Sequence, residues 1–241
     1  SFKGKSASLS FDGSGDFVSM MLSECKNNKI KILKKIHLPD SIGFFYTAIT
    51  QFLGFQNYGD EYKIMGLAAY GQHSNNYDMS KIIKIDDKEF YKINNKYIKM
   101  HSGGSAEKVF NSNVVIDKWF KPEIEQLLGK SRKPNSKIKQ SHMDIARAVQ
   151  THFEKISLEC IKKLSKLVDT KNLCLSGGCA LNGLLAGKIA KNTKFKNIYI
   201  PPASSDDGLS VGAAFYLWNN ILNNKRTSPM KHAYWGPEYN N

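Results

Sequence analysis

The chain has 241 residues, of which 35 are lysine or arginine and 21 are aspartate or glutamate, so its net charge is +14. Hydrophobic residues make up 41% and charged residues 23%, a composition typical of a folded globular protein and not of a disordered chain. No run of about 18 apolar residues occurs, which argues against a membrane-spanning helix.

Other features predict a cytoplasmic protein that is part of a longer chain. The four cysteines form no C-x-x-C pair and are too sparse for a disulfide scaffold, which favours a reducing compartment. No charged stub followed by an apolar stretch opens the sequence, so we expect no signal peptide. Because the first residue is Ser1 and not methionine, we interpret the sequence as a piece of something longer.

The positive charge does not by itself predict nucleic-acid binding. Arginine, the side chain best suited to phosphates and base edges, occurs only at Arg132, Arg147 and Arg226. The other basic residues are lysines, spread along a chain that is rich in asparagine and isoleucine, which indicates a compositional bias. Nucleic acid is therefore not the favoured partner.

The first half of the chain predicts a meander and two helices. Residues 5–37 read as three strands with a tight turn at 12–16, because Asp-Gly between alternating strands favours a hairpin. A proline, an acid and a serine open a helix over 39–54, which a glycine ends, and a second helix covers 60–69. Residues 81–100 alternate again and predict a small peripheral hairpin.

The second half predicts a long helix and then a parallel unit. The cation-rich stretch at 129–140 has no apolar period and predicts a linker or loop that need not be ordered. Apolar residues at spacings of three and four predict a helix over 141–169, opened by a capping box of Ser141 and Asp144. After it the pattern predicts a strand at 172–175, a turn at 176–178, a helix at 180–190, a strand at 197–200, a loop at 201–205 and a helix at 206–222. Such a unit is typical of a parallel sheet with helices against it.

A glycine pair stands between the predicted strand and helix of this unit, at Ser176-Gly177-Gly178. It lets the backbone approach a ligand closely, and the helix start that follows offers free N–H groups to a phosphate or ribose. The same pattern also occurs in tight connections that bind nothing, and alone it does not decide between the two.

Acidic residues occur at two other turns. Asp206 and Asp207 stand where the last helix begins. Either Ser205 or Asp206 caps the N–H groups of that helix, or a carboxylate is held for a metal ion at the carboxyl ends of the strands. In residues 12–15, small residues can cradle a phosphate while Asp12 holds the metal that bridges it. The alternative for that segment is an ordinary hairpin turn.

Taken together, these segments resemble the O-carbamoyltransferases, a family that includes the nodulation-factor, tobramycin and cephamycin enzymes. Residues 60–71, DEYKIMGLAAYG, match the specific D-E-x-K-x-M-G-L-A-x-Y-G signature. Three less specific matches follow the order of the family: DGSG at 12–15, GGCALN at 177–182 and DDGLSVGAA at 206–214. The resemblance spans about residues 5–238 and ends at WGPE, residues 235–238.

The resemblance implies a fold and a domain plan. The expected fold class is α/β, the two-lobed fold of actin, sugar kinases and heat-shock ATPases, here without its N-terminal part and without the family's YrdC-like domain. Residues 1–140 would form the first part of a domain like the tRNA threonylcarbamoyl transferases, including the peripheral hairpin and the basic linker. Residues 141–241 would form the nucleotide-binding lobe.

The resemblance also implies a reaction. Carbamoyl-adenylate, made from carbamoyl phosphate and ATP by the YrdC-like domain, would pass its carbamoyl group to a hydroxyl of a small-molecule acceptor. No membrane partner is implied, and a homodimer stays open.

Specific residues follow from the same resemblance. Asp12 and Lys63 would be catalytic groups, and Asp12 and Asp206 would bind a divalent metal, iron first, with magnesium or manganese as alternatives. Asp207 would point away or cap the helix. The implied nucleotide contacts are Gly13, Ser14, Gly15, Ser176, Gly177, Gly178 and Asn182.

Two departures from the family leave alternatives open. The H-x-x-x-H pair that completes the family's metal site would lie before Ser1, and the YrdC-like portion is absent beyond Asn241, so we expect this stretch to be inactive alone. A tRNA-modifying threonylcarbamoyl-type transferase, which the positive charge would suit, is one alternative function. A non-catalytic nucleotide-binding module is the other, because a fold does not fix a function.

Overall fold

The computed structural model describes residues 2, 4–99, 108–110, 113–115 and 117–226, and also residues 232, 234, 236, 237 and 239. Of the WGPE stretch, only Gly236 and Pro237 are among the described residues. Within the described part, no helix is long and apolar enough to cross a membrane.

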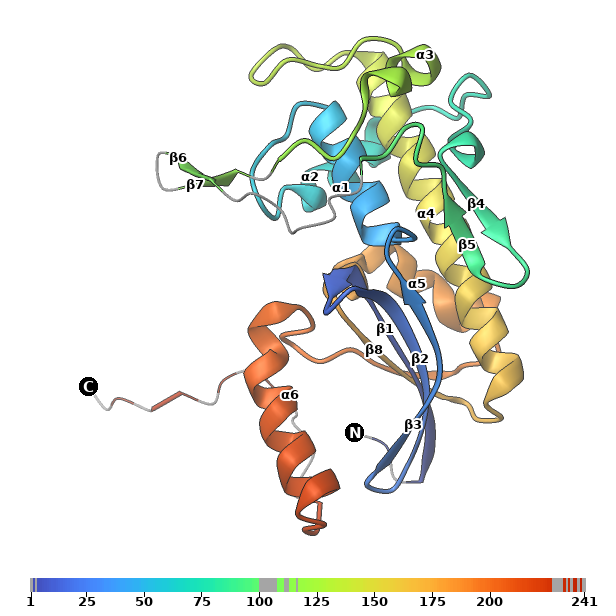
Figure 1. Cartoon of the computed structure of the whole chain (residues 1–241), viewed down its shortest axis with the longest axis vertical. Coiled ribbons are helices and arrows are strands. Elements are labelled where there is room, and N and C mark those ends of the chain that lie inside the picture. Colours follow the sequence, from blue (N-terminus) through green and yellow to red (C-terminus); the bar gives the residue numbers. More distant parts are fainter. Residues whose placement is uncertain are drawn as a thin grey trace.

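A five-stranded mixed sheet forms the centre of the molecule (Figure 1). Its strands lie in the order β3-β2-β1-β8-β9. The predicted meander is confirmed as β1 (Lys5–Gly15), β2 (Val18–Lys26) and β3 (Lys29–His37). The predicted parallel unit supplies β8 (Asn172–Ser176) and β9 (Asn197–Tyr199), and β8 runs parallel to both β1 and β9. The carboxyl ends of β1 and β8 therefore meet at one edge of the sheet.

The turn after β1 differs from the prediction. It lies at Asp16 and Phe17, which have φ angles of 51° and 63°, and not over residues 12–16. The ladder between β1 and β2 is irregular between Phe11 and Gly15, so the intervening residues leave the regular pairing. The Asp-Gly pair at 12–13 therefore does not make the hairpin turn. It shapes an irregular end of β1.

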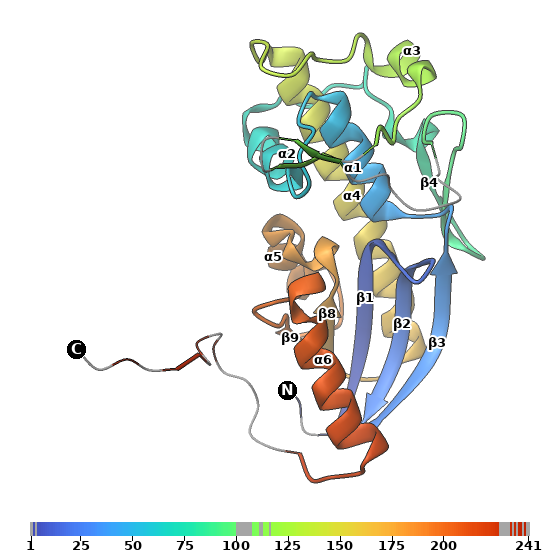
Figure 2. The ribbon, with the colours of Figure 1, turned by 60° about the vertical axis from the view of Figure 1, so that its left-hand side comes forward.

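Most of the helices cover the sheet or lie beyond the end at which β1 stops. The helices are α1 (Ile42–Phe52), α2 (Glu61–Leu67), α3 (Glu125–Leu128), α4 (Gln140–Leu167), α5 (Gly183–Asn192) and α6 (Leu209–Tyr216). α4 and α6 lie on opposite sides of the sheet, while α1 and α2 lie beyond the end of β1 (Figure 2). Fully buried side chains of β1, α1 and α4, such as Leu9, Phe45 and Phe153, form the core between these elements. By contrast, no residue of α6 is buried.

Two segments that were expected to be peripheral or loose are packed. The hairpin of β4 (Ile83–Asp86) and β5 (Phe90–Ile93) carries the fully buried Tyr91, and the Ile93 amide donates to Asp40 at 2.8 Å. In the cation-rich stretch 129–140, the Arg132 side chain is buried and donates to the Leu53 carbonyl oxygen at 2.5 Å. A further hairpin, β6 (Lys108–Phe110) and β7 (Asn113–Val115), was not predicted.

Three helix starts also differ from the predicted ones. Lys139 is the N-cap residue of α4, and its backbone N–H donates to His142 Nδ1 at 3.0 Å. The proposed capping box is wrong, because Asp144 accepts from the Gln72 amide instead. A 3₁₀ turn over Gly178–Leu181 precedes α5, which Asn182 caps. A second 3₁₀ turn, over Asp206–Gly208, precedes α6, and a π turn over Leu217–Ile221 follows α6.

Candidate functional site

Asp12 lies at the irregular end of β1 and is held by backbone amides. Its Oδ1 accepts from the Gly13 N–H at 2.7 Å, and its Oδ2 accepts from the Gly178 N–H at 2.6 Å. The second bond crosses from β1 to the turn after β8, which is possible because these parallel strands end side by side. Charge-assisted bonds to both oxygens fix the orientation of the carboxylate.

Three glycines allow the backbones to come this close. Gly177 has a φ of +90°, and a Cβ there would lie 2.2 Å from the Phe11 carbonyl oxygen. A Cβ on Gly178 would lie 2.8 Å from Asp12 Oδ1, and one on Gly43 of α1 would lie 2.5 Å from the Gly13 nitrogen. The predicted glycine pair is therefore used to approach Asp12 and β1. Gly43 was missed by the sequence reasoning, because a single helical glycine carries no signal of its own.

Asp206 is positioned by the loop that follows β9. The loop is tied to the turn after β8, since the Gly177 N–H donates to the Ser204 carbonyl oxygen at 2.6 Å. Asp206 Oδ2 accepts a hydrogen bond from the Tyr58 hydroxyl at 3.0 Å. The neighbouring Asp207 is exposed and does not line the cavity described next.

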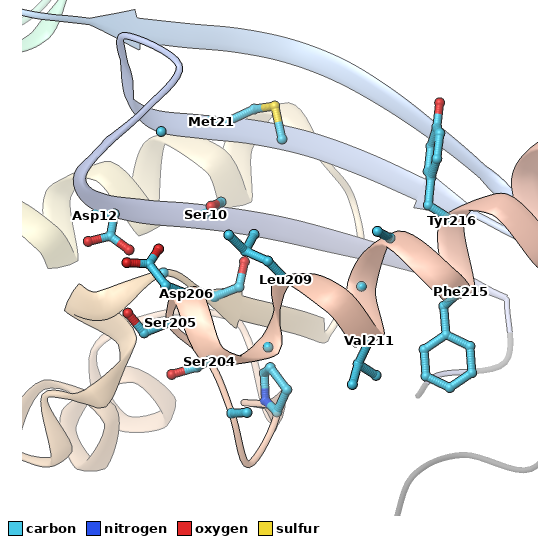
Figure 3. A pocket seen from close by; sticks show the side chains of 18 of the residues that line it. Ser10, Asp12, Met21, Ser204, Ser205, Asp206, Leu209, Val211, Phe215 and Tyr216 are labelled. Carbon is cyan, nitrogen blue, oxygen red and sulfur yellow. The ribbon is translucent and has the colours of Figure 1, made fainter.

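The two carboxylates point toward each other at one end of a cavity of about 1060 Å³ (Figure 3). Asp12 comes from the end of β1 and Asp206 from the turn before α6, so distant parts of the sequence meet here. The lining includes Ser14, Gly15, Ser176 and Gly177 from the predicted set, and an apolar portion that contains Met21, Leu209, Val211, Phe215 and Tyr216.

The other predicted site residues lie outside the lining of the cavity. Gly13, Gly178, Asn182 and Lys63 do not line the cavity. The Lys63 ammonium pairs with Asp60 at 2.6 Å, and this hydrogen bond is the main reason that the pKa of Lys63 is raised. Asn182 caps α5 by accepting from the Leu185 N–H at 3.0 Å, and its amide group exchanges two hydrogen bonds with Gln150.

A buried polar network on α4 supports the turn after β8 and was missed by the sequence reasoning. Gln150 and Glu154 lie on the buried side of α4 and are 4% and 6% exposed. The Tyr46 hydroxyl donates to Gln150 Oε1 at 2.8 Å, Gln150 donates to Glu154 at 2.9 Å, and Lys188 pairs with Glu154. Two polar residues four apart on the apolar side of an amphipathic helix were the available signal.

Burial and nearby negative charge together raise the pKa values of two groups close to the site. Burial, the hydrogen bond to Asp206 and the charges of Asp206, Asp12 and Glu61 raise the pKa of Tyr58 to about 12. Burial first, and then the charges of Asp12 and Glu61, raise the pKa of the Cys179 thiol well above its usual value. Cys179 is therefore a neutral thiol at pH 7 and not an activated nucleophile.

The acidic residues suit a metal ion only in part. Asp12 and Asp206 offer hard oxygen ligands to one space, which magnesium, manganese and iron accept. However, the described residues contain no group of three His, Cys, Asp or Glu side chains arranged to hold an ion. The remaining ligands would have to come from a bound nucleotide, from water or from other protein segments.

Comparison with known proteins shows which family the chain belongs to. Residues 1–215 match the family model described as the carbamoyltransferase N-terminus. The chain belongs to this carbamoyltransferase family. The resemblance noted in the sequence is thus confirmed, and the family region includes the ends of β1 and β8 and the turn that carries Asp206.

Similar proteins cover nearly all of the chain. An uncharacterized protein of Synechocystis sp. is 32% identical over 98% of the chain. Nodulation protein NolNO of Sinorhizobium fredii is 29% identical over 95%, and nodulation protein NolO of Bradyrhizobium diazoefficiens is 27% identical over 97%. The chain spans 37%, 30% and 38% of the lengths of these three relatives.

Proposed function

We propose that the chain supplies the acceptor-side catalytic centre of an enzyme that transfers a carbamoyl group from carbamoyl-adenylate to a hydroxyl of a small molecule. Membership in the carbamoyltransferase family supports a carbamoyl group as the group that is transferred. The observation that carries the proposal is the convergence of Asp12 and Asp206 at one end of a large cavity.

The residues of the chain would act mainly by positioning. An acyl-adenylate already carries a good leaving group, so the site needs orientation and charge stabilisation more than a strong nucleophile. Ser14, Gly15 and Ser176 line the cavity beside Asp12 and present small polar groups to a phosphate. Lys63, held by Asp60 away from the cavity lining, stays a predicted catalytic group without support from the geometry.

A divalent metal ion would be held by Asp12 and Asp206. Each oxygen of Asp12 accepts one backbone hydrogen bond, and a carboxylate oxygen has a second lone pair to offer a cation. When bound, such an ion supplies Lewis-acid polarisation of an oxygen on the carbamoyl or phosphate group. The two aspartates would orient the ion and the substrate between β1 and the turn before α6.

The wider organisation of the enzyme also belongs to the proposal. The mixed sheet with helices on both sides would be one lobe of a two-lobed fold like that of actin and the sugar kinases. Closure of two lobes would exclude the water that competes with the acceptor hydroxyl. Carbamoyl phosphate and ATP would be used by a YrdC-like domain of the full-length protein, in the cytoplasm.

Product analysis tests this function directly. The full-length protein is incubated with carbamoyl phosphate, ATP and a panel of sugars and other hydroxyl compounds, and products are identified by mass spectrometry. We expect ATP-dependent addition of one carbamoyl group to an acceptor. Modified adenosine in added tRNA, or nucleotide binding without any product, would contradict the proposal and favour one of the two alternatives.

A pair of neighbouring acids gives a matched control. Asp206→Ala removes the carboxylate that faces Asp12, so we expect product formation to fall about a hundredfold or more. Asp207→Ala removes an exposed carboxylate of the same turn and should leave the rate within about twofold, as usual for surface substitutions. Equal losses in the two variants would show that the turn and not the Asp206 carboxylate is needed.

A further inference from the structure

Tyr58 makes a contact that neither the motifs nor the family match explains. It lies in the segment between α1 and α2, yet its hydroxyl reaches Asp206 in the loop after β9, at 3.0 Å from Oδ2. The Tyr58 side chain is not part of the core, since it is 59% exposed. The contact therefore joins the segment between α1 and α2 to the turn before α6 and contributes little apolar burial.

Asp206 has few other means of keeping its orientation. Its turn is tied down at Ser204, two residues earlier, and α6 beyond it buries no side chain. Among the residues that the structure describes, Tyr58 is the one hydrogen-bond donor to the Asp206 carboxylate. Asp12, by contrast, receives a backbone N–H on each oxygen.

The geometry points to Tyr58 as a positioning residue that holds Asp206 toward Asp12. This inference rests on the proposed function, because it gives the orientation of Asp206 a role in the same site. A phenol suits the task, since it donates a hydrogen bond without adding a positive charge. The carboxylate pair thus keeps its full negative charge for a cation, whereas a lysine at the same place would neutralise half of it.

The positioning role is tested first on the metal-free protein. Tyr58→Phe removes only the hydroxyl, and Tyr62→Phe does the same to an exposed tyrosine of α2. Hydrogen exchange of the full-length protein is followed by mass spectrometry over residues 204–216. We expect about threefold faster exchange there in Tyr58→Phe, because the local opening free energy falls, and no change in Tyr62→Phe. Equal exchange in both variants would overturn the inference.

Manganese binding then tests the consequence for the site. In a titration followed by electron paramagnetic resonance, Tyr58→Phe should weaken Mn²⁺ binding about tenfold, the low end of the loss seen when a partner that orients a metal ligand is removed. Asp206→Ala should weaken it further, and adding Tyr58→Phe to Asp206→Ala should have no additional effect. An undiminished effect of Tyr58→Phe in the Asp206→Ala background would overturn the inference, because Tyr58 would then act on something else.

The outcomes separate this inference from the proposed function. If Asp206→Ala impairs Mn²⁺ binding and product formation while Tyr58→Phe behaves as Tyr62→Phe, the role of Tyr58 is refuted and the site stands. If Asp206→Ala leaves both unchanged, the proposed site and the role of Tyr58 fail together. Faster exchange in Tyr58→Phe with unaltered Mn²⁺ affinity would reduce Tyr58 to a structural contact and also refute the inference.

Discussion

The two sides of the cavity are built in opposite ways. On one side, β1 pairs with β2 and β8, is covered by α1 and α4, and carries near its end Asp12, which is held by two backbone amides. On the other side, α6 buries no residue, and Asp206 before it is held by one partly exposed side chain. The site thus combines a fixed carboxylate with one whose position depends on a single contact.

This difference bears on how such a site could admit a substrate. A group fixed by a packed sheet needs no ordering when a ligand arrives, which lowers the entropic cost of binding. A helix without buried side chains costs little to shift, so the side of Asp206 can adjust to the ligand. We expect mutations to reveal the same contrast, with large effects in the packed side and small ones in α6.

At the site itself, the largest effect is expected where β1 and the turn after β8 touch. Gly177→Ala places a Cβ 2.2 Å from the Phe11 carbonyl oxygen at a residue with a φ of +90°. It should lower the free energy of unfolding by about 3 kcal/mol through strain and overpacking, measured by urea denaturation. Gly187→Ala, in α5 with open space around it, should instead raise stability by about 0.5–1 kcal/mol. Similar values for both would contradict the tight approach at Gly177.

The next effect concerns the buried polar network behind the site. Gln150→Ala leaves the Tyr46 hydroxyl and the Asn182 amide without their shared partner. The loss of free energy of unfolding should be about 2 kcal/mol, the cost of orphaned buried polar groups. Thr151→Ala, at an exposed position of the same helix, is the control and should cost less than about 0.5 kcal/mol. If Gln150→Ala were as stable as Thr151→Ala, the prediction that this network stabilises the packed side would be wrong.

A smaller effect is expected from His152 on the same side. Burial lowers the pKa of His152, against the opposing effect of its hydrogen bond with the Ile83 carbonyl oxygen. The unfolded chain therefore takes up this proton more readily, and stability is lost as the pH falls below the ordinary histidine pKa of about 6.5. The free energy of unfolding, measured by urea between pH 7 and pH 5, should fall less steeply in His152→Gln than in the unmodified chain. His73→Gln, at an exposed position, should keep the original slope, and identical slopes in all three proteins would contradict the prediction.

The smallest effect is expected in α6. Phe215→Ala should change the free energy of unfolding of the 241-residue chain by less than about 0.5 kcal/mol, because Phe215 is 43% exposed. Phe153→Ala, in the core, should cost about 4 kcal/mol. Thermal or urea unfolding checks both. A large loss for Phe215→Ala would mean that α6 is packed in solution and that the contrast between the two sides is weaker than described.

Periodic patterns predicted the elements of the packed side well. Alternation identified the meander of β1 to β3, and spacings of three and four identified α4 to within two residues of each end. The family motifs at 12–15 and 206–214 also pointed to the two aspartates that the structure brings together. The periodic signals can be found in the sequence alone, because the apolar residues on the buried face of a strand or helix recur at a fixed spacing.

Features that depend on distant partners could not be predicted. Arg132 is ordered because Leu53 and Ser136 offer it carbonyl oxygens and the Phe55 ring lies 4.8 Å below its guanidinium, none of which local composition reveals. The hairpin turn falls on Phe17 with a φ of 63°, a conformation that sequence rules reserve for glycine and asparagine. Tyr58 lies outside every motif, and only the fold shows that it reaches Asp206.

The central place of β1 has a consequence for how the protein is made. Its neighbour β2 follows within the first 26 residues, but its other neighbour, β8, begins only at Asn172. While the ribosome synthesises the intervening chain, one edge of β1 stays open and can pair with other chains. Gly178, which supplies the second bond to Asp12, emerges later still. The nascent protein thus carries an exposed strand edge, and an aspartate with half of its anchors, until β8 and the turn after it have been synthesised.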